Sequence, residues 1–216
     1  WSQTWFSSLN HNSQFNQEIL VPQPNGQFPT GTRFEIRPSI IRSGPVGEDS
    51  STSIDNTAQS VFVPFVIDSE SPDVIGLQEI KALESDVNFR IFQDLGYEVY
   101  WYPAVKKGYS GVAVFSKQKP SLVVQGTGHE MSDAEGRVIR VDFGDLTIIN
   151  AYFPSGTSGD LRQAYKYQWL DEFYNWVEAL RKERPNIIIA GDYNIAHQAI
   201  DIHDPKGNKK SSGFLP

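Results

Sequence analysis

Apolar residues gather into short runs, or alternate with polar ones, along most of the chain from about residue 61 onward. Runs of four to eight residues rich in Val, Ile, Tyr and Phe, bounded by Gly, Pro, Asn or Ser, are typical of β-strands. Strands therefore dominate this part of the chain. The pattern predicts them at residues 73–79, 97–103, 111–116, 121–125, 137–143, 146–153 and 186–191.

One segment has helical rather than strand periodicity. Apolar side chains recur there every three or four residues over about six turns, which places them on one face of a helix that we expect to pack on a sheet. Asp160 is the predicted N-terminal cap, and the basic pair Arg181-Lys182 suits the C-terminal end. The apolar stripe consists of Leu161, Tyr165, Trp169, Phe173, Trp176 and Leu180.

The first 60 residues differ in composition from the rest. They are rich in Asn, Gln, Ser, Pro and Gly, and they contain one predicted strand, at residues 33–36. We therefore divide the chain into an N-terminal segment of unassigned origin, residues 1–60, and a domain at residues 61–216. The run Val61–Ile67 stays unassigned, because its β-branched and aromatic residues favour a strand while Pro64 forbids a central one.

Many short strands with one or two covering helices predict an α+β fold, a layered two-sheet β-sandwich flanked by helices. The strands look antiparallel, because helices do not alternate regularly with them as they would in a doubly wound parallel sheet. With 39% hydrophobic residues, the chain can bury a substantial core. No apolar run approaches the roughly 20 residues that a membrane-spanning helix requires, and the start of the chain, which opens on Trp1, shows no signal peptide.

Charge and cysteine content narrow the chemistry. The formal net charge of −7 argues against a general nucleic-acid coat, but Lys106-Lys107 and residues 206–210 form local basic clusters that suit a nucleic-acid backbone. The chain has no cysteine, so a metal site would use oxygen or imidazole ligands. This favours Mg²⁺, with Mn²⁺ as the alternative, and makes zinc a poor candidate.

Two predicted strands end on an acid, at Glu79 and at Asp192. Asp192 and Asn194 lie two residues apart, so both side chains would reach one cation or phosphate if the extended conformation continued. Equally open is an Asx turn in which Asp192 leaves the strand and Asn194 caps the next turn. Glu79 would either bind a cation or stabilise the start of a helix near residues 80–82. Two strand-end acids in one domain favour a shared Mg²⁺ site.

Three other features carry alternative interpretations. Tyr152 ends a predicted strand and would be either a site residue or an ordinary core aromatic. His197 fits a structural histidine better than a ligand. The loop Lys107-Gly108-Tyr109-Ser110-Gly111 is basic and flanked by glycine, so Lys107, Tyr109 and Ser110 would meet a DNA backbone, or the loop is an ordinary hairpin turn.

Taken together, these segments resemble the exonuclease III branch of the endonuclease/exonuclease/phosphatase superfamily, which contains the apurinic/apyrimidinic endonucleases. The matches occur in the family's order. They are residues 72–79, Lys107 to Ala113, Glu135-Gly136-Arg137-Val138-Ile139, Asn150 to Pro154, Gly191 to His197 and Ser212-Gly213-Phe214-Leu215-Pro216.

The resemblance implies a role for each strand-end group. Glu79 would be a Mg²⁺ ligand, and Tyr152 would donate a hydrogen bond to the scissile phosphate. Asp192 would activate water or protonate the leaving oxygen and also contact the metal, and Asn194 would be a ligand or a transition-state stabiliser. The implied substrate is double-stranded DNA with abasic sites or 3′ ends, and the implied location is intracellular, in the cytoplasm and nucleoid or in the nucleus.

The chain departs from the family at both ends. The family's opening Asn-x-Asn-Gly strand has no match in residues 50–60, and its final third, with a further Asp and an Asp-His pair, would lie beyond Pro216. We therefore expect an incomplete sandwich, covered by residues 1–60, by a second copy or another chain, or by the rest of a longer enzyme. The leading hypothesis is a Mg²⁺-dependent DNA-repair nuclease. The alternative is a catalytically inactive module that binds DNA or protein, and lipid phosphoesterase chemistry is disfavoured.

Overall fold

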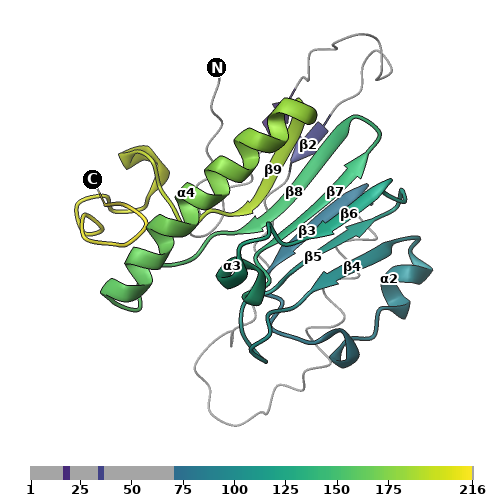
Figure 1. Ribbon diagram of the computed structural model, residues 1–216, viewed down its shortest axis with the longest axis horizontal. Coiled ribbons are helices and arrows are strands. Elements are labelled where there is room, and N and C mark those ends of the chain that lie inside the picture. The colour runs from purple at the N-terminus through teal and green to yellow at the C-terminus, as the bar shows by residue number, and fades with distance from the viewer. Residues whose placement is uncertain (1–16, 20–33, 37–70, 216) are drawn as a thin grey trace. The chain divides into compact units, whose positions relative to one another are not determined.

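The computed structural model describes residues 17–19, 34–36 and 71–215. From residue 71 onward the elements form two β-sheets with helices on their outer faces (Figure 1). Every strand predicted after residue 70 is confirmed, with each end within one residue of the prediction. These strands are β3 (Val74–Gln78), β4 (Glu98–Tyr102), β5 (Val112–Ser116), β6 (Leu122–Gln125), β7 (Val138–Phe143), β8 (Leu146–Tyr152) and β9 (Asn186–Asp192).

The N-terminal region contributes one small sheet to the described structure. Its strands β1 (Gln17–Ile19) and β2 (Phe34–Ile36) pair antiparallel, which confirms the strand predicted at residues 33–36 and adds β1. The ambiguous run Val61–Ile67 and the domain boundary at residues 60 and 61 lie outside the described residues. The boundary therefore stays a prediction.

The main body has two stacked sheets, which confirms the predicted α+β layered sandwich. One sheet has the order β3-β5-β4 and is antiparallel throughout, and the other has the order β6-β7-β8-β9. The expectation of antiparallel strands is wrong for the last pair, because β8 and β9 run parallel. The helix α4 (Asp160–Glu183) makes the crossover that a parallel pair requires.

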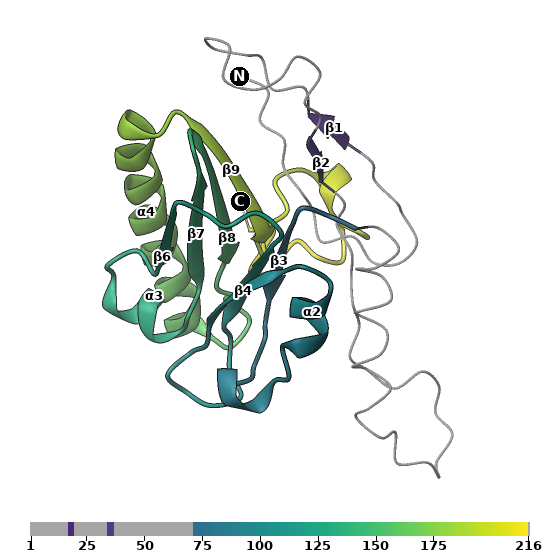
Figure 2. The same ribbon diagram turned by 90° about the vertical axis from the view of Figure 1, so that its right-hand side faces the viewer.

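Two apolar layers follow from the alternation of side chains along β8. Ile148 and Tyr152 point into the core between the sheets, where they meet Val112 and Val114 of β5. Ile149 and Ala151 point to the opposite face and pack under α4. Figure 2 shows the layers edge-on, with α4 against the four-stranded sheet and the three-stranded sheet on its other side.

The helix α4 packs on the sheet as predicted, through Trp169, Phe173 and other residues of the stripe. Two details of the prediction are wrong. Leu161 is 90% exposed; it lies in the first turn of α4, and the buried residues of the helix begin at Tyr165. Asp160 is the first helical residue rather than the cap, because Gly159, with φ of 97°, occupies the cap position. The remaining short elements are α2 (Arg90–Asp94), α3 (Glu130–Ala134) and 3₁₀ turns at Glu84–Asp86 and Ala199–Asp201.

A buried amide joins the two sheets. Asn150 of β8 is 1% exposed, and its side-chain nitrogen donates to the carbonyls of Leu77 in β3 and Ala113 in β5, at 3.0 and 2.9 Å. Its oxygen accepts a hydrogen bond of 2.5 Å from Gln78. A Cβ on Gly76 would lie 2.8 Å from that oxygen, so glycine gives Asn150 its room. The two sheets therefore have one polar register as well as an apolar contact.

In the part of the fold that the structure describes, β3 and β9 are edge strands of their sheets. What completes the sandwich, whether residues 1–60, a second copy or another chain, or the rest of a longer enzyme, stays a prediction. Among the same residues, no helix is both long enough and apolar enough to cross a bilayer.

A partly buried ion cluster around the buried Asp142 connects the end of α4 to the sheet. Asp142 accepts hydrogen bonds from Arg140, at 2.6 and 2.9 Å, and from Thr147 at 2.8 Å, and Arg184 lies 3.8 Å away. Burial by itself would raise the pKa of the Asp142 carboxyl, but the hydrogen bonds from Arg140 and Thr147 and the charges of Arg140 and Arg184 outweigh it. The pKa of Asp142 therefore lies below its ordinary value of 3.8.

This shift predicts an acid-dependent loss of stability. Because the folded pKa of Asp142 is the lower one, its contribution is complete above the ordinary pKa and is lost as pH falls through the folded pKa. Asp142→Asn should lower the free energy of unfolding by about 3 kcal/mol at pH 7, and the gap to wild type should narrow toward pH 2. Urea unfolding at several pH values measures this. Asp94→Asn, on an exposed pair, is the control, and a gap independent of pH would contradict the assignment.

Candidate active site

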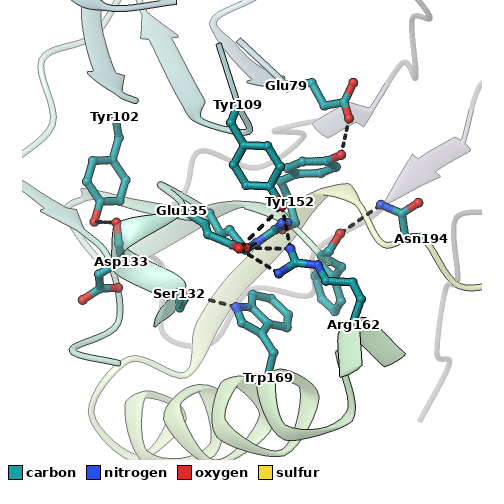
Figure 3. Close-up of polar contacts among 12 residues, drawn as sticks. Glu79, Tyr102, Tyr109, Ser132, Asp133, Glu135, Tyr152, Arg162, Trp169 and Asn194 are labelled. Carbon is teal, nitrogen blue, oxygen red and sulfur yellow. Dashed lines mark hydrogen bonds and ion pairs between the residues drawn. The ribbon is translucent and has the colours of Figure 1, made fainter. Parts of the chain in front are cut away.

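The ends of β3, β8 and β9 meet at one rim of the sandwich and bring the predicted acids together. Tyr152 is the last residue of β8 and pairs in register with Asp192, the last residue of β9. The Tyr152 hydroxyl donates a hydrogen bond to the carboxylate of Glu79, which follows β3 on the opposite sheet (Figure 3). Glu79, Tyr152 and Asp192 therefore form one constellation, although they lie far apart in the sequence.

Glu79 is held by its backbone as well as by Tyr152. Its φ of 55° is left-handed, and no helix begins at residues 80–82 in the described structure, so the helix-start interpretation is wrong. Instead, the amides of Ile80 and Lys81 bond to the carbonyls of Gly111 and Ser110, at 3.3 and 2.9 Å. The Glu79 side chain is 48% exposed, and its second oxygen lies 3.1 Å from the Lys81 ammonium. A cation can therefore reach this carboxylate.

Asp192 and Asn194 adopt the turn that the sequence left open. The Asn194 amide N–H donates to the Asp192 carboxylate at 2.9 Å, which closes an Asx turn, and Asn194 has φ of 50°. The Asn194 side-chain nitrogen bonds the Phe153 carbonyl at 2.9 Å and lies 3.5 Å from the second Asp192 oxygen. The strand does not continue through Asn194, but the turn itself keeps the two side chains together. His197, farther along, is exposed.

A buried lysine of α4 stabilises this turn by hydrogen bonds to backbone carbonyls. Lys166 of α4 is 1% exposed, and its ammonium donates to the carbonyls of Asn194 and Ser212, at 2.8 and 3.2 Å. Burial lowers the pKa of Lys166, and the charge of Asp192 acts in the opposite direction. Gly213 packs closely here, because a Cβ on it would lie 2.5 Å from the Asn194 carbonyl. The Ser212–Pro216 motif therefore meets the Gly191–His197 motif in space through its first residues.

The pKa values of the Asp192 and Glu79 carboxyl groups are shifted in opposite directions. Burial raises the pKa of Asp192, and the negative charge of Glu79 adds to this effect, against the Asn194 amide and the charges of Lys166 and Arg137. Burial by itself would also raise the pKa of Glu79. Hydrogen bonds from Tyr152 and Lys81 and nearby positive charges outweigh burial and bring this pKa below the ordinary value. Burial and the Glu79 carboxylate raise the pKa of Tyr152, so its hydroxyl stays protonated. Opposed shifts of neighbouring acids are typical of acid–base sites.

Tyr152 is both a core aromatic and a site residue. It is 8% exposed, and its ring belongs to the core between the sheets. The Arg137 guanidinium lies 4.8 Å from the centre of that ring and donates to the Tyr152 carbonyl at 2.8 Å. The two interpretations of Tyr152 are therefore compatible, because the ring is buried while the hydroxyl reaches Glu79.

The loop at residues 107–111 lies beside Glu79, but its three candidate residues differ in exposure. Lys107 is exposed, with its ammonium 4.0 Å from the Asp86 carboxylate. Tyr109 is half-buried, and its hydroxyl accepts a hydrogen bond of 2.8 Å from Arg162. Ser110 is 2% exposed, so its side chain is buried, and its expected contact with DNA stays a prediction. Ser110 instead contributes its carbonyl to the backbone beside Glu79.

Backbone strain concentrates at this rim. In the described ranges, six residues other than glycine have positive φ, and four of them, Glu79, Lys81, Ser110 and Asn194, lie in the segments just described. Such conformations cost of order 1–3 kcal/mol each and tend to occur where function requires them. The strain supports the view that the rim is a functional site rather than an ordinary set of turns.

The donor set suits a hard cation. Glu79 and Asp192 supply carboxylate oxygens and Asn194 lies beside them, which matches the one or two carboxylates by which Mg²⁺ is usually held. The residues that the structure describes contain no group of three or more acidic, His or Cys side chains that would enclose a metal ion. An open site with few protein ligands leaves positions for water and a phosphate.

Several residues that build this rim were not identified as site residues from the sequence. Asn150, Arg137 and Lys166 are each at most 2% exposed, yet their residue types are usually found on surfaces. The one available signal for Arg137 was its position in the Glu135–Ile139 motif. No local signal marks Lys166, which lies in α4 between the buried Tyr165 and the exposed Tyr167.

Comparison with known proteins agrees with this geometry. The Endonuclease/Exonuclease/phosphatase family matches the chain over residues 46–215, beginning upstream of the motifs that start at residue 72. An exodeoxyribonuclease of Bacillus subtilis is 43% identical over 145 residues, which cover 67% of this chain and 56% of that protein. The DNA repair nuclease APEX1 of Danio rerio is 40% identical over 149 residues, covering 68% of this chain and 48% of that protein.

Solved structures show the same fold. An AP endonuclease from Archaeoglobus fulgidus superposes with a TM-score of 0.65 at 28% identity, covering 74% of this chain and 62% of that one. A 3′-5′ exonuclease from Neisseria meningitidis gives a TM-score of 0.64 at 26% identity, covering 71% of this chain and 59% of that one. The chain spans about half the length of the curated relatives it matches. By sequence and by fold, the chain belongs to the endonuclease/exonuclease/phosphatase family.

Proposed function

We propose that this chain is a metal-dependent DNA-repair nuclease that hydrolyses phosphodiester bonds, with apurinic/apyrimidinic endonuclease and 3′-5′ exodeoxyribonuclease activity. The observation that carries the proposal is the convergence of Glu79, Tyr152 and Asp192 at one rim. Relatives named exodeoxyribonuclease and DNA repair nuclease support the same reaction class. The substrate is double-stranded DNA with abasic sites or 3′ ends.

Each rim residue has a chemical role in this proposal. Glu79, Asp192 and Asn194 would hold Mg²⁺, for which Mn²⁺ could substitute, and the ion would supply neutralisation of the charge on the phosphate oxygens. Tyr152 donates a hydrogen bond from its hydroxyl to a phosphate oxygen, a role that its raised pKa supports because the hydroxyl stays protonated. Asp192 activates the attacking water or protonates the leaving oxygen, because a buried carboxyl with a raised pKa exchanges protons closer to neutral pH.

Basic side chains near the rim provide the approach surface. Lys107 and Tyr109 meet the DNA backbone beside Glu79, and Lys206, Lys209 and Lys210 extend the exposed positive charge after β9. Phosphate contacts of this kind position the duplex without reading its sequence. We place the protein where DNA is found inside the cell, in the cytoplasm and nucleoid or in the nucleus.

A second candidate is a catalytically inactive module that binds DNA or protein. It is favoured by the lack of a match to the family's opening Asn-x-Asn-Gly strand in residues 50–60. The two candidates differ in a single measurable property, which is metal-dependent strand cleavage.

Incision of an abasic-site duplex tests the proposal. With Mg²⁺ the chain should cut the duplex, EDTA should abolish cutting, and Asp192→Asn should lower the rate by about 10²- to 10⁴-fold through loss of the acid–base group. Asp171→Asn, the same change at an exposed position of α4, is the control and should cut normally. Duplex binding without metal-dependent incision would support the inactive module instead.

The Tyr152 hydroxyl has its own test. Tyr152→Phe should lower kcat and kcat/KM together by about 10²- to 10³-fold, because the lost donor acts on charge that develops in the transition state. Tyr174→Phe removes a hydroxyl from an exposed tyrosine of α4 and should leave both constants unchanged. A change confined to KM would mean that Tyr152 only binds substrate.

A further inference from the structure

The proposed function gives no role to the Glu135-Gly136-Arg137 motif, although this motif lies directly behind Tyr152. Glu135 follows α3, and Gly136 has φ of 58° with a Cβ position only 2.7 Å from the Pro103 carbonyl. Only glycine fits this turn, which brings Glu135 and Arg137 side by side. Their side chains pair at 2.5 Å between the Arg137 Nε and a Glu135 oxygen.

On one side of Glu135 the chain of contacts reaches the proposed catalytic tyrosine. Arg137 is 2% exposed, so its charge needs a partner, and Glu135 provides it. Arg137 then contacts Tyr152 twice, by its hydrogen bond to the carbonyl and by its position 4.8 Å from the ring centre. Arg137 therefore fixes both the backbone and the ring of Tyr152.

On the other side the contacts reach the loop at residues 107–111. Arg162 of α4 forms a two-pronged pair with Glu135, at 2.7 and 2.8 Å. The same Arg162 donates to the Tyr109 hydroxyl at 2.8 Å, and that hydroxyl lies 3.5 Å from Glu135 (Figure 3). A two-pronged arginine pair has a fixed plane, so it transmits orientation as well as charge.

Glu135 therefore stands between two guanidinium groups, with one tyrosine attached to each. Its side chain is 17% exposed. Burial alone would raise the pKa of its carboxyl, but the hydrogen bonds and charges of Arg162 and Arg137 outweigh burial and bring the pKa below the ordinary value. The Glu135 carboxylate that joins the two arginines therefore stays ionised throughout the neutral pH range.

We propose that Glu135 is a positioning residue that couples the DNA-facing loop to the catalytic tyrosine. Through Arg162 it orients Tyr109, and through Arg137 it orients Tyr152, so that seating of the DNA backbone on the loop and alignment of Tyr152 depend on each other. This inference rests on the proposed nuclease function for its kinetic consequence, but the contacts themselves do not require it.

A double-mutant cycle tests the coupling. In the otherwise unchanged chain, Tyr109→Phe and Tyr152→Phe should combine non-additively, with kcat/KM departing from additivity by about threefold to tenfold. In a Glu135→Gln background the same two changes should combine additively within about twofold. Glu135→Gln alone should lower kcat more than it raises KM, and Glu135→Asp, which keeps the charge, should recover part of the loss.

Controls separate coupling from simple structural support. Glu178→Gln makes the same change at an exposed pair with Arg181 and should leave kcat and the coupling intact. If Glu135→Gln fails to fold, Arg162→Lys keeps the charge but removes the two-pronged geometry, and it should also abolish the coupling. Unchanged coupling in the folded Glu135→Gln or Arg162→Lys variant would overturn the proposal.

A readout independent of activity distinguishes failure of the coupling from failure of the proposed function. With ¹³Cζ-labelled tyrosine, the Tyr152 NMR signal, assigned by its loss in Tyr152→Phe, should shift when Tyr109 becomes Phe. The shift should disappear in the Glu135→Gln background. If the chain cuts no DNA but this shift behaves as stated, the proposed function fails and the coupling stands. If the chain cuts DNA and the shift is absent or persists in Glu135→Gln, the coupling fails.

Discussion

The hydrogen bonds of the Asn150 amide are the interaction on which the rest of this structure depends. One side chain satisfies two carbonyls of the opposite sheet and receives a bond from Gln78. An apolar interface between two sheets tolerates sliding, because hydrophobic contact has no direction. A buried amide does not tolerate it, because each polar group that loses its partner costs about 1–3 kcal/mol. Asn150 therefore sets which residue of one sheet faces which residue of the other.

This register between the two sheets also determines the positions of the site residues. Asn150 and Tyr152 lie two apart on β8 and share a face, while Gln78 and Glu79 are consecutive at the end of β3. Once Asn150 meets Gln78, Tyr152 is in position to meet Glu79. Asp192 then follows from the parallel pairing of β8 with β9. Two short polar contacts across the sandwich thus determine the position of three groups that come from separate strands.

Much of this could be predicted from the sequence, because strands and amphipathic helices leave local patterns. The strand at residues 186–191 and the stripe of α4 needed no knowledge of their partners. The direction of β9 depends on its pairing with β8, and the exposure of Leu161 depends on where α4 begins to pack on the sheet, and the prediction was wrong at both places. Asp160 lost the cap position to Gly159, whose positive φ is not visible as a pattern of polarity.

The candidate acids were identified for a similar reason, since a polar residue at the end of an apolar run stands out. Arg137 and Lys166 did not stand out, because the residue type alone does not distinguish a buried charged side chain from an exposed one. Their burial makes sense only with their partners, Glu135 for Arg137 and the carbonyls of Asn194 and Ser212 for Lys166. The supporting groups of a site are therefore harder to find from sequence than the groups they support.

Because Glu79 and Tyr152 come from opposite sheets, neither sheet alone contains all the residues of the site. A substitution that loosens the contact between the sheets would damage the chemistry even if every rim residue were kept. The reaction therefore also requires interior positions such as Gly76, whose missing side chain makes room for Asn150. In this chain, the packing between the sheets and the reaction at the rim therefore depend on the same residues.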